Sequence, residues 1–295
     1  MKKMVEIILI PTQGFCNRLR AIASAYILAS FLKTKLYVNW IPEECCNCKI
    51  TDLLLTRFDT KDLNDIKTST YIFNPRVHTE HFLQSSDILN VDYLVIQGGH
   101  EFKHKNMSEL DFLKKKNMFY NSLKWVSEIN EIVNEKQLSN AVGIHFRDFI
   151  KQFDDSDGRD FSKVSPLESF EKHTLDLVTN SDYNFFISSN SDKAYKTLSK
   201  IIPYDRLHTL SDINVSRNCP KGIIHAVANL LILSKCNFII GTVFSSYSDE
   251  ACFFNMIMKL CIGNEKITKY HCYGYNELYS YNTLLPDFQT LKLLT

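Results

Sequence analysis

The sequence predicts an α/β fold with two doubly wound, Rossmann-type domains that face a cleft. Three observations lead to this prediction. Short apolar strands alternate with helical segments in two separate stretches of the 295-residue chain. The first stretch opens with a strand, a loop, a helix and a strand, which is the order of a parallel βαβ unit. The second opens with residues 141–147, whose continuous apolar start is typical of a parallel strand covered on both faces. We expect the domains to be residues 1–138 and 139–295, with a C-terminal tail that could cross back to the first domain.

The first domain is expected to begin with a buried strand and not with a signal peptide. Glu6 interrupts the apolar run near the N-terminus, and Pro11 ends it early. The next segment repeats apolar residues at helical spacing, beginning with Leu19 and Ile22. The elements expected in this domain are strands at 7–11, 35–41, 71–73 and 93–97, a helix at 18–33, and a helical stretch at 107–135.

The second domain continues the alternation of strands and helices. Pro166 suits the first turn of a helix, and the polar residues 189–191 suit the start of the next one. An acidic loop at 154–160 follows the first strand. The elements expected here are strands at 141–147, 183–188, 207–210 and 238–242, and helices at 166–177, 191–200, 223–235 and 245–258.

The composition argues against several classes of protein. Hydrophobic residues make up 45% of the chain and charged residues 23%, which is typical of a globular protein and not of a disordered one. Lys and Arg number 34 against 33 Asp and Glu, so we expect no nucleic-acid partner. No uninterrupted apolar run reaches about 18 residues, so we expect no membrane span and a cytoplasmic location. The sequence does not give the oligomeric state.

The nine cysteines are expected to be mostly reduced thiols. Cys45, Cys46 and Cys48 form a cluster that has two interpretations. A zinc site would need a second pair of ligands, for which His78 and His81 are the candidates. Their spacing is not diagnostic, so a loop with small buried thiols is the simpler interpretation. We therefore expect no metal and no cofactor.

Turns beyond the carboxyl ends of parallel strands are where ligands bind, so these turns are the candidate site. The first turn covers residues 14–18. Gly14 allows a sharp turn or the close approach of a ligand to the backbone. Asn17 and Arg18 lie at a helix N-terminus, which favours anions. An ordinary turn with an Asn cap explains the same residues.

The strand at 141–147 ends on two polar side chains. His145 and Arg147 point to the same side, because side chains alternate along a strand. A charged Arg at the end of a buried strand needs a partner. Either Asp148 or another carboxylate pairs with it, or Arg147 binds a phosphate, whose oxygens suit the planar guanidinium. His145 is either a core histidine or a hydrogen-bond partner of the same phosphate.

Two further strand-to-helix turns are rich in hydroxyl groups. Such turns can bond a base, a ribose or a phosphate, or they can simply cap the helix that follows. Two hydroxyl-rich turns in the same domain as an Arg-tipped strand make a coherent anion site. The residues concerned are Ser188, Ser189, Asn190 and Asp192 in one turn, and Thr242, Ser245 and Ser246 in the other.

The familiar nucleotide motifs are absent from the sequence. It contains neither a P-loop nor the glycine fingerprint of dinucleotide-binding enzymes, which argues against a reductase. Asp155-Ser156-Asp157 has the form of a metal–diphosphate clamp, but it lies in the acidic loop and is more simply a solvated turn. We therefore expect Arg147 and backbone amides, and not a metal, to stabilise a leaving diphosphate.

Three blocks resemble motifs of the GT-B fucosyltransferase superfamily. This superfamily includes the nodulation-type chitooligosaccharide fucosyltransferases, the α1,2- and α1,6-fucosyltransferases and the protein O-fucosyltransferases. The blocks are residues 14–21 (GFCNRLRA), residues 145–147 (HFR), and residues 233–242 together with 245–248. The combination is typical of the superfamily, whereas no single block is.

The resemblance implies a GT-B-like fold and an inverting, metal-independent transfer of fucose from GDP-fucose to a glycan or another sugar. The C-terminal domain would hold most of the donor. Arg147 would bond the β-phosphate, with His145 close to the nucleotide. Ser245 and Ser246 would help to hold the diphosphate, and Asn17 would lie near the fucose and the acceptor.

Two departures from the family pattern leave alternatives. Asp148 and Phe149 follow the His-x-Arg strand end, where some relatives have a cation, and His225 and Asn229 stand in a helix where an acidic residue is expected. The chain could instead use another nucleotide sugar, or be a non-catalytic sugar- or nucleotide-binding protein. The acceptor and the linkage are not predicted. By position alone, the candidates for a general base are Asp148, Asp154 and Asp155.

Overall fold

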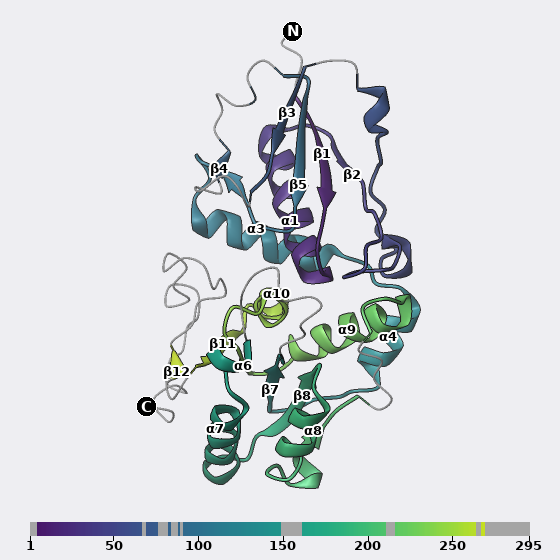
Figure 1. Ribbon diagram of the computed structural model, residues 1–295. Helices are drawn as coiled ribbons and strands as arrows, with labels where there is room; N and C mark the ends of the chain where they lie inside the picture. The colour runs from purple at the N-terminus through teal and green to yellow at the C-terminus, as the bar shows by residue number, and fades with distance from the viewer. Residues whose placement is uncertain are drawn as a thin grey trace. The chain divides into compact units, whose positions relative to one another are not determined.

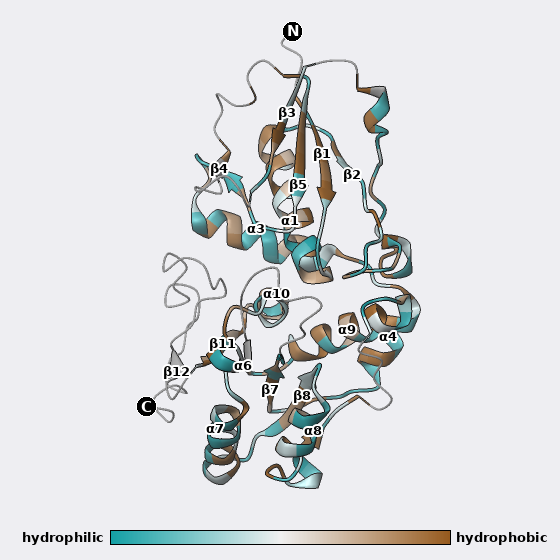
Figure 2. Ribbon diagram, viewed as in Figure 1, coloured by the Kyte–Doolittle hydropathy of each residue, from teal (hydrophilic) through white to brown (hydrophobic). Residues whose placement is uncertain are grey.

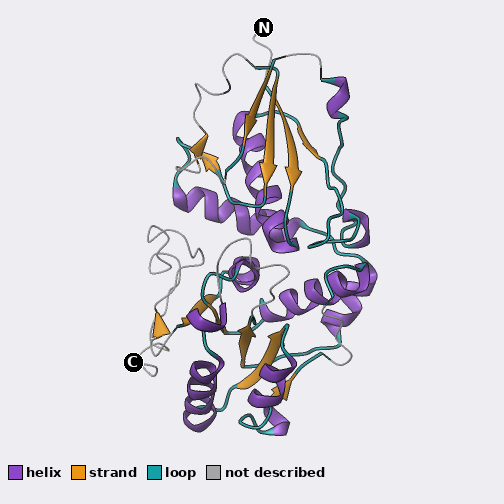
Figure 3. Cartoon of the chain, viewed as in Figure 1, coloured by secondary structure: helices purple, strands orange, loops and turns teal. Residues whose placement is uncertain are grey.

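The computed structural model describes residues 5–66, 69–75, 82–83, 88, 91–148, 161–210, 216–263 and 267–268. Contacts within the chain group it into two compact units, Met1–Glu131 with Asn214–Val227, and Ile132–Ile213 with Ala228–Thr295. We call these unit 1 and unit 2. Each unit is built on a sheet of parallel strands with helices around it, as Figure 3 shows. The predicted α/β fold class is confirmed. In the described part of the chain, no helix is both long and apolar enough to cross a membrane.

Unit 1 contains a four-stranded parallel sheet in the order β2-β1-β5-β3 (Figure 1). Strand β1 lies inside this sheet, and its Ile7, Ile8 and Leu9 are fully buried. The apolar character of β1 and β5 is visible in Figure 2. The N-terminal apolar run is therefore a core strand, as predicted. The strands of unit 1 are β1 (Glu6–Pro11), β2 (Leu36–Val38), β3 (Thr70–Phe73), β5 (Tyr93–Gly98), and the separate parallel pair β4 (Phe82–Leu83) and β6 (Lys103–His104).

The helices of unit 1 begin and end at recognisable local signals. Helix α1 (Phe15–Leu32) starts before Arg18, the predicted first residue, and stops at Lys33, which adopts a left-handed conformation with φ 53°. The predicted helical stretch at 107–135 is two helices, α3 (Glu109–Ser122) and α4 (Ser127–Asn134), and α4 ends in unit 2. The extended backbone of Leu123 ends α3. Helix α1 packs against β1 and α3. Short 3-10 helices occur at Ile50–Asp52 and Leu63–Asp65.

Unit 2 contains a six-stranded sheet in the order β12-β11-β10-β7-β8-β9. All pairs are parallel except β11 with β12. The fully buried residues of β7 pack with apolar residues of β8, β10 and α7 in one core. The strands are β7 (Ala141–Phe146), β8 (Asn184–Ser189), β9 (Leu207–His208), β10 (Phe238–Thr242), β11 (Met258–Ile262) and β12 (Ile267–Thr268). The helices are α6 (Phe161–Val164), α7 (Leu167–Asn180), α8 (Asp192–Leu198), α9 (Pro220–Leu233), α10 (Ser246–Asn255) and the 3-10 turn Tyr204–Arg206; α9 begins in unit 1.

Strand β11 is an element that the sequence did not predict. The expected helix at 245–258 ends at Asn255, because Met256 adopts a left-handed conformation with φ 53°. The chain then turns into β11, which pairs in parallel with β10. Short apolar runs do not distinguish a helix from a buried strand by periodicity alone. Burial beside β10 decides it, and β11 brings a lysine, Lys259, into the core.

Each sheet has a topological switch point, where neighbouring strands are followed by connections to opposite sides of the sheet order. In unit 1, β1 lies between β2, which follows it through α1, and β5. In unit 2, β7 lies between β8, which follows it through α7, and β10. Doubly wound sheets bind ligands beyond the carboxyl ends of the strands, at such switch points. The residues singled out in the sequence lie in the loops that follow these strands.

Candidate functional site

The carboxyl ends of three neighbouring strands meet at the switch point of unit 2. His145 on β7 is in register with Ser188 on β8 and with Gly241 on β10. Phe146 is in register with Ser189. The two hydroxyl-rich turns and the His-x-Arg strand end, which were separate signals in the sequence, are thus brought to one edge of one sheet.

His145 is a buried, neutral histidine. Only 6% of its surface is exposed. Its Nδ1 lies 3.1 Å from Ser248 Oγ, and its ring stacks on Tyr247 with the centroids 4.9 Å apart. Burial lowers the pKa of His145 well below its ordinary value, and the charges of Lys259 and Arg147 lower it further. A neutral imidazole has one donor and one acceptor nitrogen, so His145 can hydrogen-bond a ligand without adding charge.

Arg147 is anchored through its backbone. Its amide donates to Thr242 Oγ1 at 2.8 Å, and the Thr242 hydroxyl donates to the carbonyl of His145 at 3.3 Å. Thr242 is fully buried at the end of β10, so it ties the ends of β7 and β10 together. The half-buried Arg147 lies just beyond β7.

The turn after β8 clamps Asp148. The Asp148 amide donates to Asn190 Oδ1 at 2.8 Å, and Asn190 Nδ2 donates back to the Asp148 carbonyl at 3.3 Å. Ser191 Oγ donates to Asp148 Oδ2 at 2.8 Å. The carboxylate of Asp148 is therefore held by the loop after β8, on the far side of β7 from β10.

The serines of the same turn serve the fold. Ser189 Oγ accepts a hydrogen bond from the Ser191 amide at 3.1 Å, which satisfies a backbone group where α8 begins. Ser188 is 5% exposed, whereas Asp192 is exposed in the first turn of α8. Between the two interpretations left by the sequence, this hydrogen bond favours capping for Ser189.

The turn after β10 presents an uncapped helix start. Ser245 is the N-cap residue of α10, but its side chain makes no capping hydrogen bond. It is fully buried, and within the described residues its Oγ has no hydrogen-bond partner. Phe244 before it has φ 60°, a strained conformation for a residue with a side chain. The first turn of α10 therefore has amide groups without intrahelical acceptors, next to Arg147 and His145.

A buried ion pair, which the sequence analysis missed, lies against the start of α10. Lys259 Nζ on β11 is 2.7 Å from Asp249 Oδ1 in the first turn of α10. Both side chains are almost completely buried. Burial alone lowers the pKa of Lys259, but Asp249 outweighs it and the pKa is raised, so this lysine is charged. The only sequence signal was a lysine within the apolar run 256–262, which the predicted helix end obscured.

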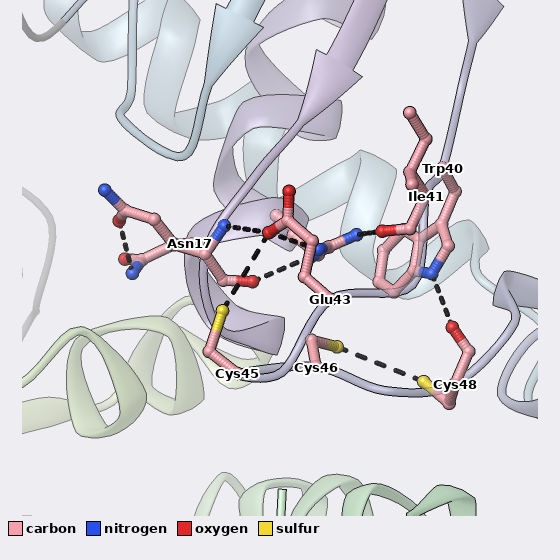
Figure 4. A network of polar contacts seen from close by, with 9 residues as sticks. Asn17, Trp40, Ile41, Glu43, Cys45, Cys46 and Cys48 are labelled. Atoms are coloured by element: carbon pink, nitrogen blue, oxygen red, sulfur yellow. Dashed lines mark hydrogen bonds and ion pairs between the residues drawn. The ribbon is translucent and has the colours of Figure 1, made fainter. Parts of the chain in front are cut away.

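In unit 1, the loop after β1 is organised around Arg18, and Figure 4 shows Ile41, Glu43 and Trp40 from this network. Arg18 is fully buried in α1. Its guanidinium donates to Gln13 O and Ile41 O, both at 2.7 Å, and to Glu43 Oε2 at 2.8 Å. It also lies over the Trp40 ring, 4.6 Å from the centroid. These partners make Arg18 a structural clamp, so we revise its predicted role from phosphate binding to support of the loop.

The strained residue of this loop is Gln13 and not Gly14. Gln13 has φ 69°, whereas Gly14 has φ −66°, and a Cβ added to Gly14 would come no closer than 3.9 Å to another heavy atom. The side chain of Asn17 donates to Gln13 Oε1 at 2.8 Å and does not cap α1. Gly99, after β5, fits closely against this loop, because a Cβ there would lie 2.7 Å from Thr12 O and 2.8 Å from Asn17 Cβ.

The cysteine cluster has the geometry of a packed loop. Cys46 and Cys48 are buried with their Sγ atoms 3.9 Å apart, and Cys45 Sγ is 3.9 Å from Glu43 Oε2. Burial raises the pKa of Cys45. Among the described residues, no group of three or more His, Cys, Asp or Glu side chains could hold a metal ion. The predicted partners His78 and His81, and the base candidates Asp154 and Asp155, lie outside the described residues.

Comparison with known proteins shows a likeness at the level of structure. No family model and no curated protein matches the sequence. Fucosyltransferase NodZ from Bradyrhizobium superposes with a TM-score of 0.58 at 15% identity, over 84% of this chain and 92% of that one. A mutant of Arabidopsis thaliana FUT1 in complex with GDP gives 0.57 at 12% identity, over 90% and 72%. POFUT1 in complex with GDP gives 0.52 at 12% identity, over 87% and 96%.

The fold is that of the GT-B fucosyltransferases. This confirms the resemblance seen in the three sequence blocks. The structure brings the second and third blocks together at the switch point of unit 2, while the first block forms the loop after β1 in unit 1. At these low identities the likeness concerns the fold, and the roles of individual residues are proposals.

Proposed function

We propose that this chain is a glycosyltransferase that transfers fucose from GDP-fucose to a glycan or another sugar, with inversion and without a metal. The observation that carries the proposal is the arrangement at the end of β7. There the Arg147 amide is tied to Thr242, and His145 is tied to Ser248, beside the uncapped start of α10. NodZ α-1,6-fucosyltransferase has been studied with GDP-fucose and with GDP, and its fold is the one found here.

Unit 2 is proposed to bind the nucleotide and to stabilise its departure. The acceptor oxygen attacks C1 of fucose, the bond from C1 to the β-phosphate oxygen breaks, and GDP leaves with the electron pair. Negative charge therefore grows on the β-phosphate. The Arg147 guanidinium and the first-turn amides of α10, including that of Ser246, are proposed to balance it. Neutral His145 is proposed to hydrogen-bond the nucleotide.

Unit 1 is proposed to serve the sugar and the acceptor. Asn17 is the candidate contact, and Arg18 and Glu43 hold the loop that carries it. The acceptor proton must pass to a base. Asp148 remains the proposed base among the described candidates, and its Oδ2 already accepts a hydrogen bond from Ser191. A carboxylate that is already hydrogen-bonded also suits the alternative of a non-catalytic binding protein, so turnover must be measured together with binding.

A ligand panel tests the proposal. Thermal unfolding is followed with GDP, UDP, CMP and their sugars, since a ligand at 100 times its dissociation constant adds about 2.7 kcal/mol of stability. We expect a shift with GDP and GDP-fucose. A shift in melting temperature with UDP and none with GDP would show that the donor is a UDP-sugar, and the proposal of a glycosyltransferase would stand. GDP binding without GDP release from GDP-fucose, over a panel of oligosaccharides, would support the binding protein instead.

A further inference from the structure

Lys259 is linked to the first turn of α10 at two points. Its Nζ lies 2.7 Å from Asp249 Oδ1 and 3.4 Å from the carbonyl oxygen of Ser245. Ser245 and Asp249 are one helical turn apart, and the Asp249 amide also donates to the Ser245 carbonyl, at 3.2 Å. The lysine therefore fixes the start of α10 to strand β11.

Gly241 makes room for this link. A Cβ on Gly241 would lie 3.0 Å from Lys259 Cε and 3.0 Å from Ser248 Oγ. Ser248 Oγ is the partner of His145 Nδ1. The missing side chain at the end of β10 thus lets the lysine and the serine pack beneath the turn after β10. Residues of β7, β10, β11 and α10 form one interlocked group.

The carbonyl that Lys259 holds belongs to the same peptide unit as the Ser246 amide. A trans peptide is planar, and its C=O and N–H groups point in opposite directions. The Ser245 carbonyl points along α10 towards Lys259 and Asp249, so the Ser246 N–H points out of the helix start. A cation at the carbonyl also polarises the peptide, which strengthens its N–H as a donor. Ser246 itself is half-buried and so is accessible to a ligand.

We propose that Lys259 is a positioning residue for diphosphate binding, acting through the Ser245–Ser246 peptide to aim and polarise the Ser246 amide. This inference rests on the proposed function, because it takes the β-phosphate of GDP as the ligand of that amide. Ser245 Oγ is buried and has no hydrogen-bond partner within the described part of the chain, which is an independent sign that this turn is built for a ligand.

The test removes the whole ion pair, because a single Lys259→Met change would leave Asp249 charged and buried and could unfold the chain. The variant is Lys259→Met with Asp249→Leu. The matched control is Lys116→Met with Glu101→Leu in unit 1, which removes another buried ion pair with a 2.8 Å contact. Calorimetry measures the dissociation constants of GDP and of guanosine, which has no phosphate. NMR follows the Ser246 amide during GDP titration.

The Lys259 variant is expected to bind GDP about 2- to 30-fold more weakly, the range for residues that act without touching the ligand. Its guanosine affinity is expected to stay unchanged, and the GDP-induced shift of the Ser246 amide to shrink. The control variant is expected to match the wild type in all three. Unchanged GDP affinity, or an equal loss for guanosine, would overturn the inference. If the wild type binds no GDP, the proposed function and this inference both fail. If Arg147→Ala weakens GDP binding and the Lys259 variant does not, only this inference fails.

Discussion

Replacing Arg147 by Ala tests the centre of the proposed donor site. The change should leave the fold intact, because the Arg147 backbone amide, which the substitution keeps, is what anchors this residue to Thr242. Arg147 as a whole residue is half-buried, so water screens part of its charge. We therefore take the value of one charge-assisted hydrogen bond, about 1.5 to 3 kcal/mol. That corresponds to a loss of about 10- to 150-fold in GDP affinity, since about 1.4 kcal/mol is a factor of ten.

Thermal unfolding gives the assay for this variant. At a GDP concentration 100 times the wild-type dissociation constant, the wild type gains about 2.7 kcal/mol, and a tenfold weaker variant gains about 1.4 kcal/mol. The melting shift should therefore fall by about half or more, and fucosyl transfer should be lost. Lys193→Ala, which removes an exposed cation on α8 in the same unit, is the control and should behave as wild type. A change of less than about threefold in GDP affinity for Arg147→Ala would refute the donor-site assignment.

Three further outcomes are expected. His145 is held neutral with a lowered pKa, so the native state binds fewer protons than the unfolded state once the pH falls below 6.5. The stability that this provides is present above that pH and is lost on acidification. His145→Gln should therefore lose less melting temperature than the wild type between about pH 6.5 and 5, and equal losses would contradict this. Gly99→Ala should lower the free energy of unfolding in urea by about 1 to 3 kcal/mol and weaken transfer, since the new Cβ would lie 2.7 Å from Thr12 O. Gly14→Ala should keep the stability of the wild type, because the nearest heavy atom to its new Cβ would be 3.9 Å away. The reverse order of stabilities would be inconsistent with the loop described. Arg206 donates to the carbonyls of Tyr183, Val178 and Ser181. Arg206→Ala should therefore lower the free energy of unfolding in urea by about 2 to 4 kcal/mol and leave the GDP affinity unchanged. A selective loss of GDP binding would count against a purely structural role.

The elements that the sequence predicted well are those with a strong local pattern. The apolar run before Pro11 forms β1 and the run at 141–147 forms β7, because a continuous apolar run of strand length is typical of a strand buried on both faces. The turns after these strands were recognised because small and hydroxyl-bearing residues follow them. Helix ends were less accurate. The apolar Leu110 and Met118 are 44% and 69% exposed, because α3 turns Phe112, Phe119 and Lys116 inward instead.

Partners that are far apart in the chain were beyond sequence reasoning. The sequence determined that this chain is an α/β protein with a strand that ends in Arg147 and with hydroxyl-rich turns, because each of those features depends on about ten consecutive residues. Only the tertiary structure decided which charged side chains pair with one another inside the fold. It committed Arg18 to Glu43 and two carbonyls, clamped Asp148 with Ser191, and placed Lys259 behind the start of α10. The physical reason is that a buried charge takes whichever partner the packing of strands brings within hydrogen-bond distance, and that packing is set by the whole sheet and not by neighbouring residues.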